Sequence, residues 1–312
     1  MEQLARAVAV AMSLLVSAEV WPATEPACER GCLNQFVEQY LGALEARDPS
    51  SLPVAGNVKF TENTVRLKLG EGLWKTITSV EPYRIIAADP STGQVAYFGV
   101  IKENGRINML GLRIKVRGGR ITEIETGVSR NNPFIEPQNL AAPRKEFATA
   151  LSPRERSTRE QMIAVADGYF EGIERRTDAG VAFSDECSRV ENGVLTAASE
   201  VPAGMKTRST GELLSCAMQF RLAASQVDTV EPRRYEVIDE ERGLVMGVFA
   251  FNLTGTRTTI RQSDGTTRPA AEWAMFPTTG PLMEMFRIRN GKLHQIEAVM
   301  MPMLPFKSGT GW

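Results

Sequence analysis

The feature that most constrains this sequence is a set of segments that occur twice in the same order. The stretches SVEPYRIIAADPSTGQV (79–95) and TVEPRRYEVIDEERGLV (229–245) both carry Val-Glu-Pro after their first residue and share Asp, Gly and Val near their ends. Further along, GGRITEIETGV (118–128) matches NGKLHQIEAVM (290–300). Because chance similarity would not keep this order, the repeat indicates two copies of one domain, and 312 residues are enough for both.

The upstream part of each copy begins with an amphipathic pattern. Apolar residues recur at helical spacing in CLNQFVEQYLGALEARD (32–48) and in QMIAVADGYFEGIERRTD (161–178), with Tyr40 and Tyr169 at matched places. A Glu-Asn pair then follows at the same distance from each tyrosine: Glu62-Asn63 and Glu191-Asn192. The repeat therefore extends over the whole of each copy.

These patterns predict an α+β fold for each copy. A helix comes first, and the later alternating runs predict a curved antiparallel sheet with helices on one face. Tight turns are expected at Gly118-Gly119 and Asn290-Gly291, and the second copy has insertions around 194–215 and 253–280. The expected organisation is a signal peptide at 1–18, a first domain at 28–130, a linker at 131–157, a second domain at 158–305 and a tail at 306–312.

The N-terminus predicts export. One Arg precedes the apolar run AVAVAMSLLVSA (7–18), which ends with small residues at the positions a signal peptidase reads. The alternative is a disordered or packed N-terminal helix. We expect a periplasmic or secreted protein without a membrane anchor, since no stretch has about 18 consecutive apolar residues. The net charge of -1 argues against a nucleic-acid partner.

The four cysteines fit an oxidising compartment. Three pairings are possible, and we favour Cys28–Cys32 with Cys187–Cys216. The first of these requires a helix end, because residues four apart within a regular helix rarely have disulfide geometry. With a single His and no second Cys pair of matching spacing, we expect no metal site.

Each copy resembles the cone-shaped α+β fold of the nuclear transport factor two-like superfamily, which includes ketosteroid isomerase, scytalone dehydratase and polyketide cyclases. The resemblance covers 28–130 and 158–305. It rests on EQYLGALEARD followed by VKFTEN, and on the closing strand pair that contains Gly-Arg-Ile or Gly-Lys-Leu. It implies two cone-shaped domains with helices on the concave face of each sheet. Members often pair through the open sheet face, so the two copies could form an intrachain pseudo-dimer, or the chain a homodimer.

The resemblance to the isomerase also implies a site. A helix tyrosine that stabilises an oxyanion matches Tyr40 and Tyr169, and the acidic base matches Glu62 and Glu191. A protonated acid before a Phe-Arg strand matches Glu284, where the first copy has Leu112. The second copy also holds the single His, His294, where the first has Thr122. The expected catalytic residues are therefore those of the second copy: Tyr169, Glu191, Glu284 and His294.

Other residues are candidates for substrate binding: Tyr40, Glu62, Asn63, Trp74, Tyr97, Asn192, Trp273 and Glu297. Each has a structural alternative. The tyrosines and tryptophans can be core residues, the Glu-Asn pairs can be strand-end turns, and His294 can be a packed or surface histidine. Glu125 and Glu297 alternate with apolar residues and are expected to point outward. Arg113 and Arg287 alternate in the same way and are expected in solvent.

The resulting hypothesis is a cofactor-independent acid–base enzyme, a lyase, dehydratase or isomerase. It would act on a small hydrophobic molecule, with aromatic molecules among the candidates, because a carboxylate in an apolar cone can exchange protons near neutral pH. The alternative is a non-catalytic exported module that binds a hydrophobic ligand or mediates assembly. The fold alone cannot decide between these two functions.

Overall fold

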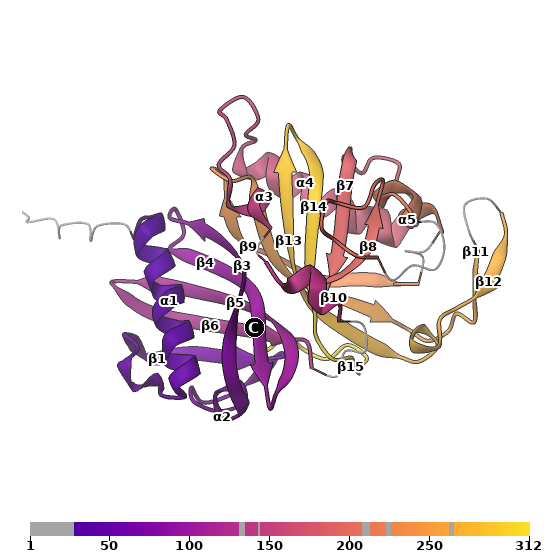
Figure 1. The fold of residues 1–312 in the computed structure, drawn as a ribbon. Coiled ribbons are helices and arrows are strands. Elements are labelled where there is room, and N and C mark those ends of the chain that lie inside the picture. Colours follow the sequence, from indigo (N-terminus) through magenta and orange to yellow (C-terminus); the bar gives the residue numbers. More distant parts are fainter. Residues whose placement is uncertain (1–27, 131–134, 143, 208–212, 223–225, 262–264) are drawn as a thin grey trace, which may run out of the picture.

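The structure is a computed structural model that describes residues 28–130, 135–142, 144–207, 213–222, 226–261 and 265–312. The expected signal peptide at 1–18 lies outside these residues, so export remains a prediction. In the described part, no helix is both long and apolar enough to cross a membrane. Figure 1 shows two sheet-rich halves, the first with α1 lying across its strands.

The first copy is a helix followed by one six-stranded sheet. The sheet has the order β2-β1-β6-β5-β4-β3. Its elements are α1 (Arg30–Ala46), η1 (Pro49–Ser51), β1 (Val54–Glu62), β2 (Val65–Arg66), α2 (Leu73–Thr76), β3 (Ile77–Asp89), β4 (Gln94–Glu103), β5 (Arg106–Arg117) and β6 (Arg120–Val128).

The second copy repeats this order with additions. Its sheet runs β8-β7-β14-β13-β10-β9, and β15 pairs with β13. The linker contains η2 (Pro137–Leu140) and α3 (Lys145–Ala148). The remaining elements are α4 (Arg159–Arg175), β7 (Phe183–Glu191), β8 (Val194–Ala198), α5 (Cys216–Leu222), β9 (Thr229–Asp239), β10 (Leu244–Leu253), β11 (Thr259–Arg261), β12 (Thr267–Pro269), η3 (Glu272–Ala274), β13 (Thr278–Arg289), β14 (Lys292–Met300) and β15 (Leu304–Pro305).

The α+β class and the two sheets are as predicted, but the sheets are not wholly antiparallel. β1 runs parallel to β6, and β7 runs parallel to β14. Short turns join β3 through β6 in the first copy, and β9 to β10 and β13 to β14 in the second, and strands joined in this way must run antiparallel. The longer connection from β10 to β13, residues 254–277, also joins antiparallel strands. The first strand reaches the sheet through a longer crossover and is free of that constraint. The expected hairpin turns are confirmed, with positive φ at Gly118-Gly119 and Asn290-Gly291.

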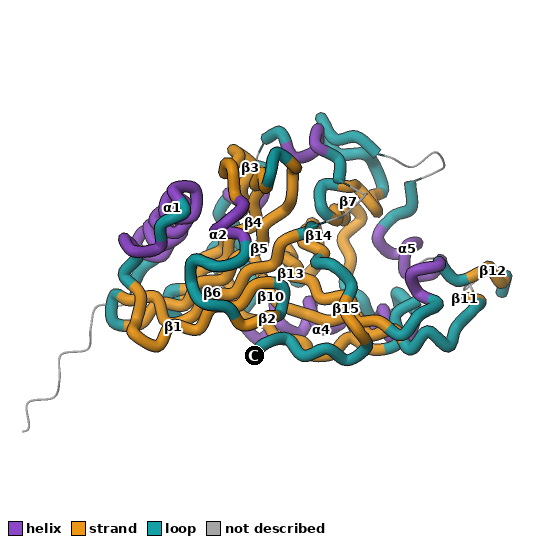
Figure 2. The backbone as a smooth tube through the Cα atoms, turned by 90° about the horizontal axis from the view of Figure 1, so that it is seen from below, coloured by secondary structure: helices purple, strands orange, loops and turns teal. Residues whose placement is uncertain are grey.

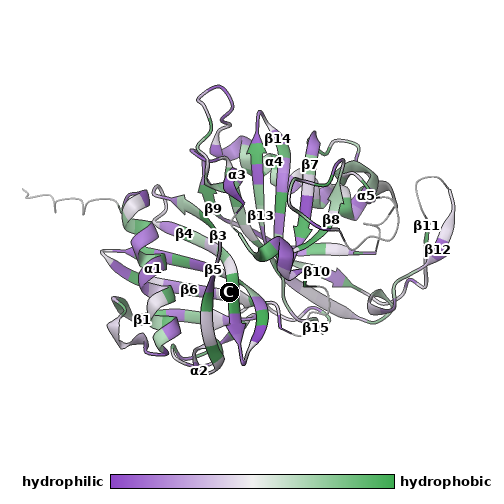
Figure 3. Ribbon diagram, in the orientation of Figure 1, coloured by the Kyte–Doolittle hydropathy of each residue, from purple (hydrophilic) through white to green (hydrophobic). Residues whose placement is uncertain are grey.

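Three large apolar clusters hold the described residues together. One lies between α1 and the first sheet, and a second between α4 and the second sheet. A third is shared by the two sheets and contains Tyr83, Phe98 and Met109 of the first copy with Met246 and Met283 of the second. Hydrophobic residues are correspondingly distributed along the strands of both sheets (Figure 3). The copies therefore contact each other through their sheets, and α1 lies on the outer side of the first sheet in the view of Figure 2.

The shared face corrects four expectations about exposure. Arg113 and Arg287 are buried rather than solvated, and Glu125 and Glu297 are buried rather than pointing outward. The face of each sheet that a single copy would expose is covered here by the other copy and by the linker. At this junction Glu125 accepts from Arg113 of its own sheet and from Arg234 of the second copy. Burial raises the pKa of Glu125, although both arginines oppose the rise.

Ion pairs cross between the copies in a reciprocal way. Arg30, the first residue of α1, binds Asp239 at 2.6 Å, and Arg159, the first residue of α4, binds Asp89 at 2.7 Å. The backbone N–H of Ala88 donates to Asp239, and that of Ile238 donates to Asp89. Asp89 and Asp239 occupy matched positions in the two repeated stretches. Each copy thus makes the same contacts to the other.

The chain that follows each closing strand also crosses over. After β6 it reaches the β7–β8 turn, where Asn139 donates to the carbonyl of Gly193 at 2.8 Å. After β14 it returns to the first copy, where the indole N–H of Trp312 donates to Thr61 at 3.0 Å. We call residues 129–130 with 135–140, and residues 301–312, the two crossing segments.

Both expected disulfides are confirmed. Cys28 is bonded to Cys32, and Cys187 to Cys216. The first lies at the start of α1, which begins at Arg30, so the helix end allows the close pairing. Two disulfides fit an oxidising, extracellular environment.

Candidate functional site

Tyr169 lies at the centre of the second copy's interior. It projects from α4 toward the sheet and is fully buried. Its ring is surrounded by those of Phe170, Phe183, Phe220 and Phe286, at centroid distances of 5.1 to 6.3 Å. Burial raises the pKa of the Tyr169 hydroxyl, which therefore stays a neutral hydrogen-bond donor.

Glu284 is a carboxyl group in the same apolar interior. It lies on β13 between Leu282 and Phe286, which face the same way because side chains alternate along a strand. Glu284 is 0% exposed. One oxygen accepts from Arg189 at 3.3 Å, whereas Oε2 has no hydrogen-bond partner among the described residues. Burial raises the pKa of Glu284 to about 7, although Arg189 opposes the rise.

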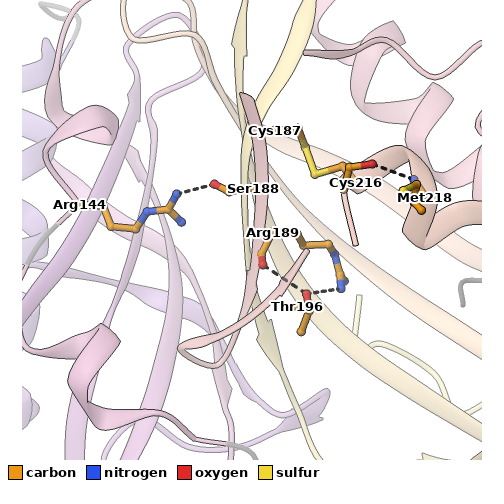
Figure 4. Close-up of a disulfide and its surroundings, with 8 residues drawn as sticks. Arg144, Cys187, Ser188, Arg189, Thr196, Cys216 and Met218 are labelled. Carbon is orange, nitrogen blue, oxygen red and sulfur yellow. Dashed lines mark hydrogen bonds between the residues drawn. A yellow bond between two sulfur atoms is a disulfide. The ribbon is translucent and has the colours of Figure 1, made fainter. Parts of the chain in front are cut away.

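Arg189 is the residue that joins this site together and that our sequence reasoning missed. It lies on β7, is 5% exposed, and forms ion pairs with both Glu284 and Glu191. It also contacts the hydroxyl of Thr196 at 3.4 Å. Figure 4 shows Arg189 with Thr196, and Ser188, the residue before it, with Arg144 of the linker. A signal was present, because VKFTEN has Phe60 at the place of Arg189 in CSRVEN.

The strand registers confirm which positions correspond between the copies. Phe60 pairs with Ile124 in the first sheet, and Arg189 pairs with Ile296 in the second. In the same way Leu112 pairs with Thr126, and Glu284 with Ala298. The first copy therefore has an apolar Phe–Leu pair where the second has a buried Arg–Glu pair.

The matched acids Glu62 and Glu191 have different partners. Glu62 is buried, accepts from the N–H of Leu73 at the start of α2 and forms an ion pair with Arg130. Glu191 is partly exposed and pairs with Arg189 instead. Only the acid of the second copy faces the Arg189–Glu284 pair.

The neighbouring asparagines fasten turns. Asn63 has φ of 46° and exchanges two hydrogen bonds with the backbone of Val128. Asn192 has φ of 47° and exchanges the same two bonds with Met300. Asparagine tolerates this left-handed conformation, and the side-chain amide closes the turn onto the last strand. These contacts are those of the strand-end turn considered above.

The candidate residues of the first copy lie in its core. Tyr40 and Trp74 meet edge to face with centroids 5.4 Å apart, and both are buried. Tyr97 is buried on β4, and its hydroxyl has no hydrogen-bond partner in the described ranges. Burial raises the pKa of both tyrosines. The neighbours of Tyr97 and Tyr40 include apolar Leu112 rather than a second acid.

Three of the predicted residues lie away from the Arg189–Glu284 pair. His294 lies near the start of β14 beside Glu186, with 3.8 Å between Nδ1 and Oε2, and burial lowers the pKa of its imidazole. Trp273 is 52% exposed. Glu297 faces the first copy, where it binds the hydroxyl of Tyr83 and the guanidinium of Arg144. The structure therefore brings together Tyr169, Glu191 and Glu284 and leaves these three outside.

A surface hollow lies on the other face of β7. It is a groove of about 940 Å³ between the linker, the β7 strand and the loop after β8. Arg144, Ser188 and Glu200 are among its lining residues. It is separated from the Arg189–Glu284 pair by the sheet itself, because Ser188 and Arg189 point to opposite faces.

The duplicated architecture agrees with one comparison. A family described as "Domain of unknown function (DUF8021)" matches residues 27–128 and 155–300. The chain belongs to the DUF8021 family. The two matched stretches of DUF8021 correspond to the two copies, consistent with tandem domains. No protein of curated function matches the sequence.

Two solved structures show partial similarity to this DUF8021 protein. One is described as a de novo designed protein with a curved beta-sheet, with 20% identity, a TM-score of 0.28 and coverage of 33% of this chain and 88% of that chain. The other is described as a de novo designed NTF2 fold protein, with 15% identity, a TM-score of 0.23 and the same coverages of 33% and 88%. Both designs match about one copy's length.

The arrangement in the second copy has defined chemical capacities. A carboxyl group with a pKa of about 7 can accept or donate a proton at neutral pH. A neutral tyrosine hydroxyl and a guanidinium can stabilise negative charge on an oxygen atom. In the ranges that the structure covers, no three His, Cys, Asp or Glu side chains are grouped as metal ligands.

Proposed function

We propose that the second copy is a cofactor-independent acid–base enzyme, a lyase, dehydratase or isomerase, acting on a small hydrophobic molecule. The observation that carries the proposal is the buried Arg189–Glu284 pair with its unpartnered Glu284 oxygen. Removing two charges from water costs several kcal/mol per ion, and apolar residues at such positions are often at least as stable. The first copy shows that this fold can use Phe60 and Leu112 instead, so packing alone gives no reason for the charged pair.

Three side chains would share the proton transfers. Glu191 would remove a proton from a carbon atom next to a carbonyl group. Tyr169 and protonated Glu284 would donate hydrogen bonds to the oxyanion that forms, with Arg189 adding positive charge beside it. In an isomerisation Glu191 then returns the proton to a different carbon. In a dehydration the oxyanion re-forms the carbonyl, a carbon–carbon double bond forms as the C–O bond of a neighbouring hydroxyl breaks, and the proton on Glu191 passes to that hydroxyl, which leaves as water. His294 has no part in this scheme because it lies beside Glu186.

We assign each copy to the nuclear transport factor two-like superfamily, with the interior between helix and sheet as its cone. We also assign the two copies to an intrachain pseudo-dimer, supported by the crossed Arg30–Asp239 and Arg159–Asp89 pairs. Contacts of this reciprocal kind are the mark of a two-fold interface. The protein would be exported to the periplasm or secreted.

For the first copy we favour a different function, which is to assemble with the second copy and support it. Its acid Glu62 is engaged by α2 and Arg130, and its Glu284 equivalent is Leu112. It contributes seven of the seventeen buried residues in the apolar cluster between the sheets. We propose that it supports the second copy without catalysing a reaction. If both copies proved inactive, a non-catalytic binding or assembly module would be the function of the whole chain.

The test is exchange of acidic carbon-bound protons for deuterium. The full-length protein would be incubated with 2-tetralone in D2O, and loss of its α-proton signals followed by NMR. Glu191→Gln and Tyr169→Phe are each expected to slow exchange by at least about 100-fold. Leu112→Met, at the first-copy position that matches Glu284, is the control and should exchange like the parent protein. Equal exchange by the parent protein and both site variants would overturn the assignment.

A further inference from the structure

We propose that α5 is a movable cover over the Arg189–Glu284 site and that the Cys187–Cys216 disulfide is its tether. α5 (Cys216–Leu222) directly follows the first insertion of the second copy. Its first residue, Cys216, is bonded to Cys187, two positions before Arg189 on β7. Because residues two apart on a strand face the same side, the tether and Arg189 share the helix-facing side of the sheet.

Phe220 is the part of α5 that closes the interior. Its ring centroid is 5.1 Å from that of Tyr169 and 5.2 Å from that of Phe183, and its side chain is buried. Met218, on the same short helix, is 42% exposed. α5 therefore lies at the boundary between solvent and the site, with one face on each side.

The matching helix of the first copy is fixed in a different way. There the N–H of Leu73 in α2 donates to Glu62, and the neighbouring Trp74 packs on Tyr40 as Phe220 packs on Tyr169. In the second copy the matching acid, Glu191, is paired with Arg189 instead. The hydrogen bond that holds α2 is replaced at α5 by a covalent link at one end of the helix.

This difference permits movement of α5. A single link at Cys216 limits how far the helix can go but leaves it free to pivot, and the contacts of Phe220 are apolar and without direction. Outward rotation would remove Phe220 from Tyr169 and open the path to Arg189 and the unpartnered Glu284 oxygen. A ligand would then take the place of the Phe220 ring.

The inference takes its site from the proposed function, but access and turnover are measured separately. The probe is phenylglyoxal, which modifies exposed guanidinium groups, with modification of each arginine quantified by peptide mass spectrometry. The full-length Cys187→Ser/Cys216→Ser variant is compared with Cys28→Ser/Cys32→Ser, which removes the other disulfide. Arg113, buried between the sheets and 1% exposed, reports any general unfolding in the same sample.

Loss of the tether is expected to speed modification of Arg189 by at least about 10-fold while Arg113 stays protected. The Cys28→Ser/Cys32→Ser control should leave Arg189 as protected as in the parent protein. Phe220→Ala, which keeps the disulfide, should also expose Arg189. The proposal that α5 covers the site would be wrong if Arg189 stayed protected in both the Cys187→Ser/Cys216→Ser and Phe220→Ala variants. It would also be wrong if Arg113 became exposed to the same extent as Arg189. Suppose that Arg189 becomes exposed in these variants but Glu191→Gln exchanges protons like the parent protein. That result would support α5 as a cover and contradict the proposed enzymatic function.

Discussion

The two copies have the same strand order and nearly the same contacts to each other, yet their interiors differ in polarity. At two matched positions the first copy has Phe60 and Leu112, whereas the second has Arg189 and Glu284. The frame around these positions, including the Glu-Asn turns and the crossed ion pairs, is retained. Contacts that the fold requires are present in both copies. Residues present in one copy alone, such as Arg189 and Glu284, are therefore not required by the fold.

The fourth strand of each copy carries an aromatic ring and a glycine at matched positions, but in opposite order. In the first copy the Tyr97 ring lies over Gly99, and in the second the Phe249 ring lies over Gly247. Gly247 corresponds to Tyr97 and Phe249 to Gly99, so ring and glycine have changed places. A side chain added at either glycine would collide with the ring. The same space is filled from opposite directions, and the hydroxyl of Tyr97 has no counterpart beside Glu284.

The largest expected effect comes from breaking the charged pair on one side only. Glu284→Leu copies the first-copy residue but leaves Arg189 buried without this partner, and should lower the free energy of unfolding by about 3–5 kcal/mol. The double variant Arg189→Phe/Glu284→Leu copies both residues and should recover most of that loss. Urea denaturation of the three proteins measures the difference. A double variant no more stable than the single one would show that the interiors are not interchangeable.

The next effect is the pH dependence of stability. Burial raises the pKa of Glu284 from 4.5 to about 7, so the folded protein keeps a proton that the unfolded chain releases between these values. Rising pH through this window should therefore lower the free energy of unfolding, by up to about 3 kcal/mol, with no further change above it. Glu284→Gln removes the titrating group, so the free energy of unfolding of this variant should fall less between pH 5 and 8 than that of the parent protein. If the free energy of unfolding fell equally with pH in both proteins, the raised pKa of Glu284 would be contradicted.

A third prediction tests whether the crossed contacts are equivalent. Asp89→Ala and Asp239→Ala each remove one of the two aspartates that hold an arginine and a backbone N–H of the other copy. Each should lower the free energy of unfolding by about 2 kcal/mol, and the two losses should be similar. Chemical denaturation checks both. A loss confined to one variant would mean that the two matched contacts contribute unequally to the free energy of unfolding.

The smallest expected effect concerns the two long helices. α4 begins with a capping box between Thr158 and Gln161, whereas Glu29 before α1 makes no side-chain capping bond. Thr158→Ala should cost about 1 kcal/mol, and Glu29→Ala should be close to neutral. Thermal unfolding of the two variants measures the loss of stability in each. Equal losses would show that the side-chain cap of α4 does not make it more stable than α1.

The sequence predicted those features that depend on local signals. Helix periodicity, Gly-containing turns and the two disulfides follow from nearby residues, and the repeat supplied the domain organisation. Burial of Arg113 and Glu125 did not follow, because alternation along one strand shows two faces but does not show that another sheet covers the second. Tyr169, Glu191 and Glu284 came from a resemblance, and the structure does place them around one point. Arg189 was not predicted, although the difference between Phe60 and Arg189 lies two residues before the matched acids Glu62 and Glu191.

The two crossing segments have a consequence for synthesis. Thr61 of the first copy binds Trp312, which lies 251 positions later in the chain, and Arg30 binds Asp239, 209 positions later. A ribosome makes the chain from its N-terminus at about 5–20 residues per second, so the first copy must wait many seconds for these contacts. During that interval the apolar face that later meets the second sheet has no partner within the chain. The first copy is therefore the part of the nascent protein that most needs protection from aggregation.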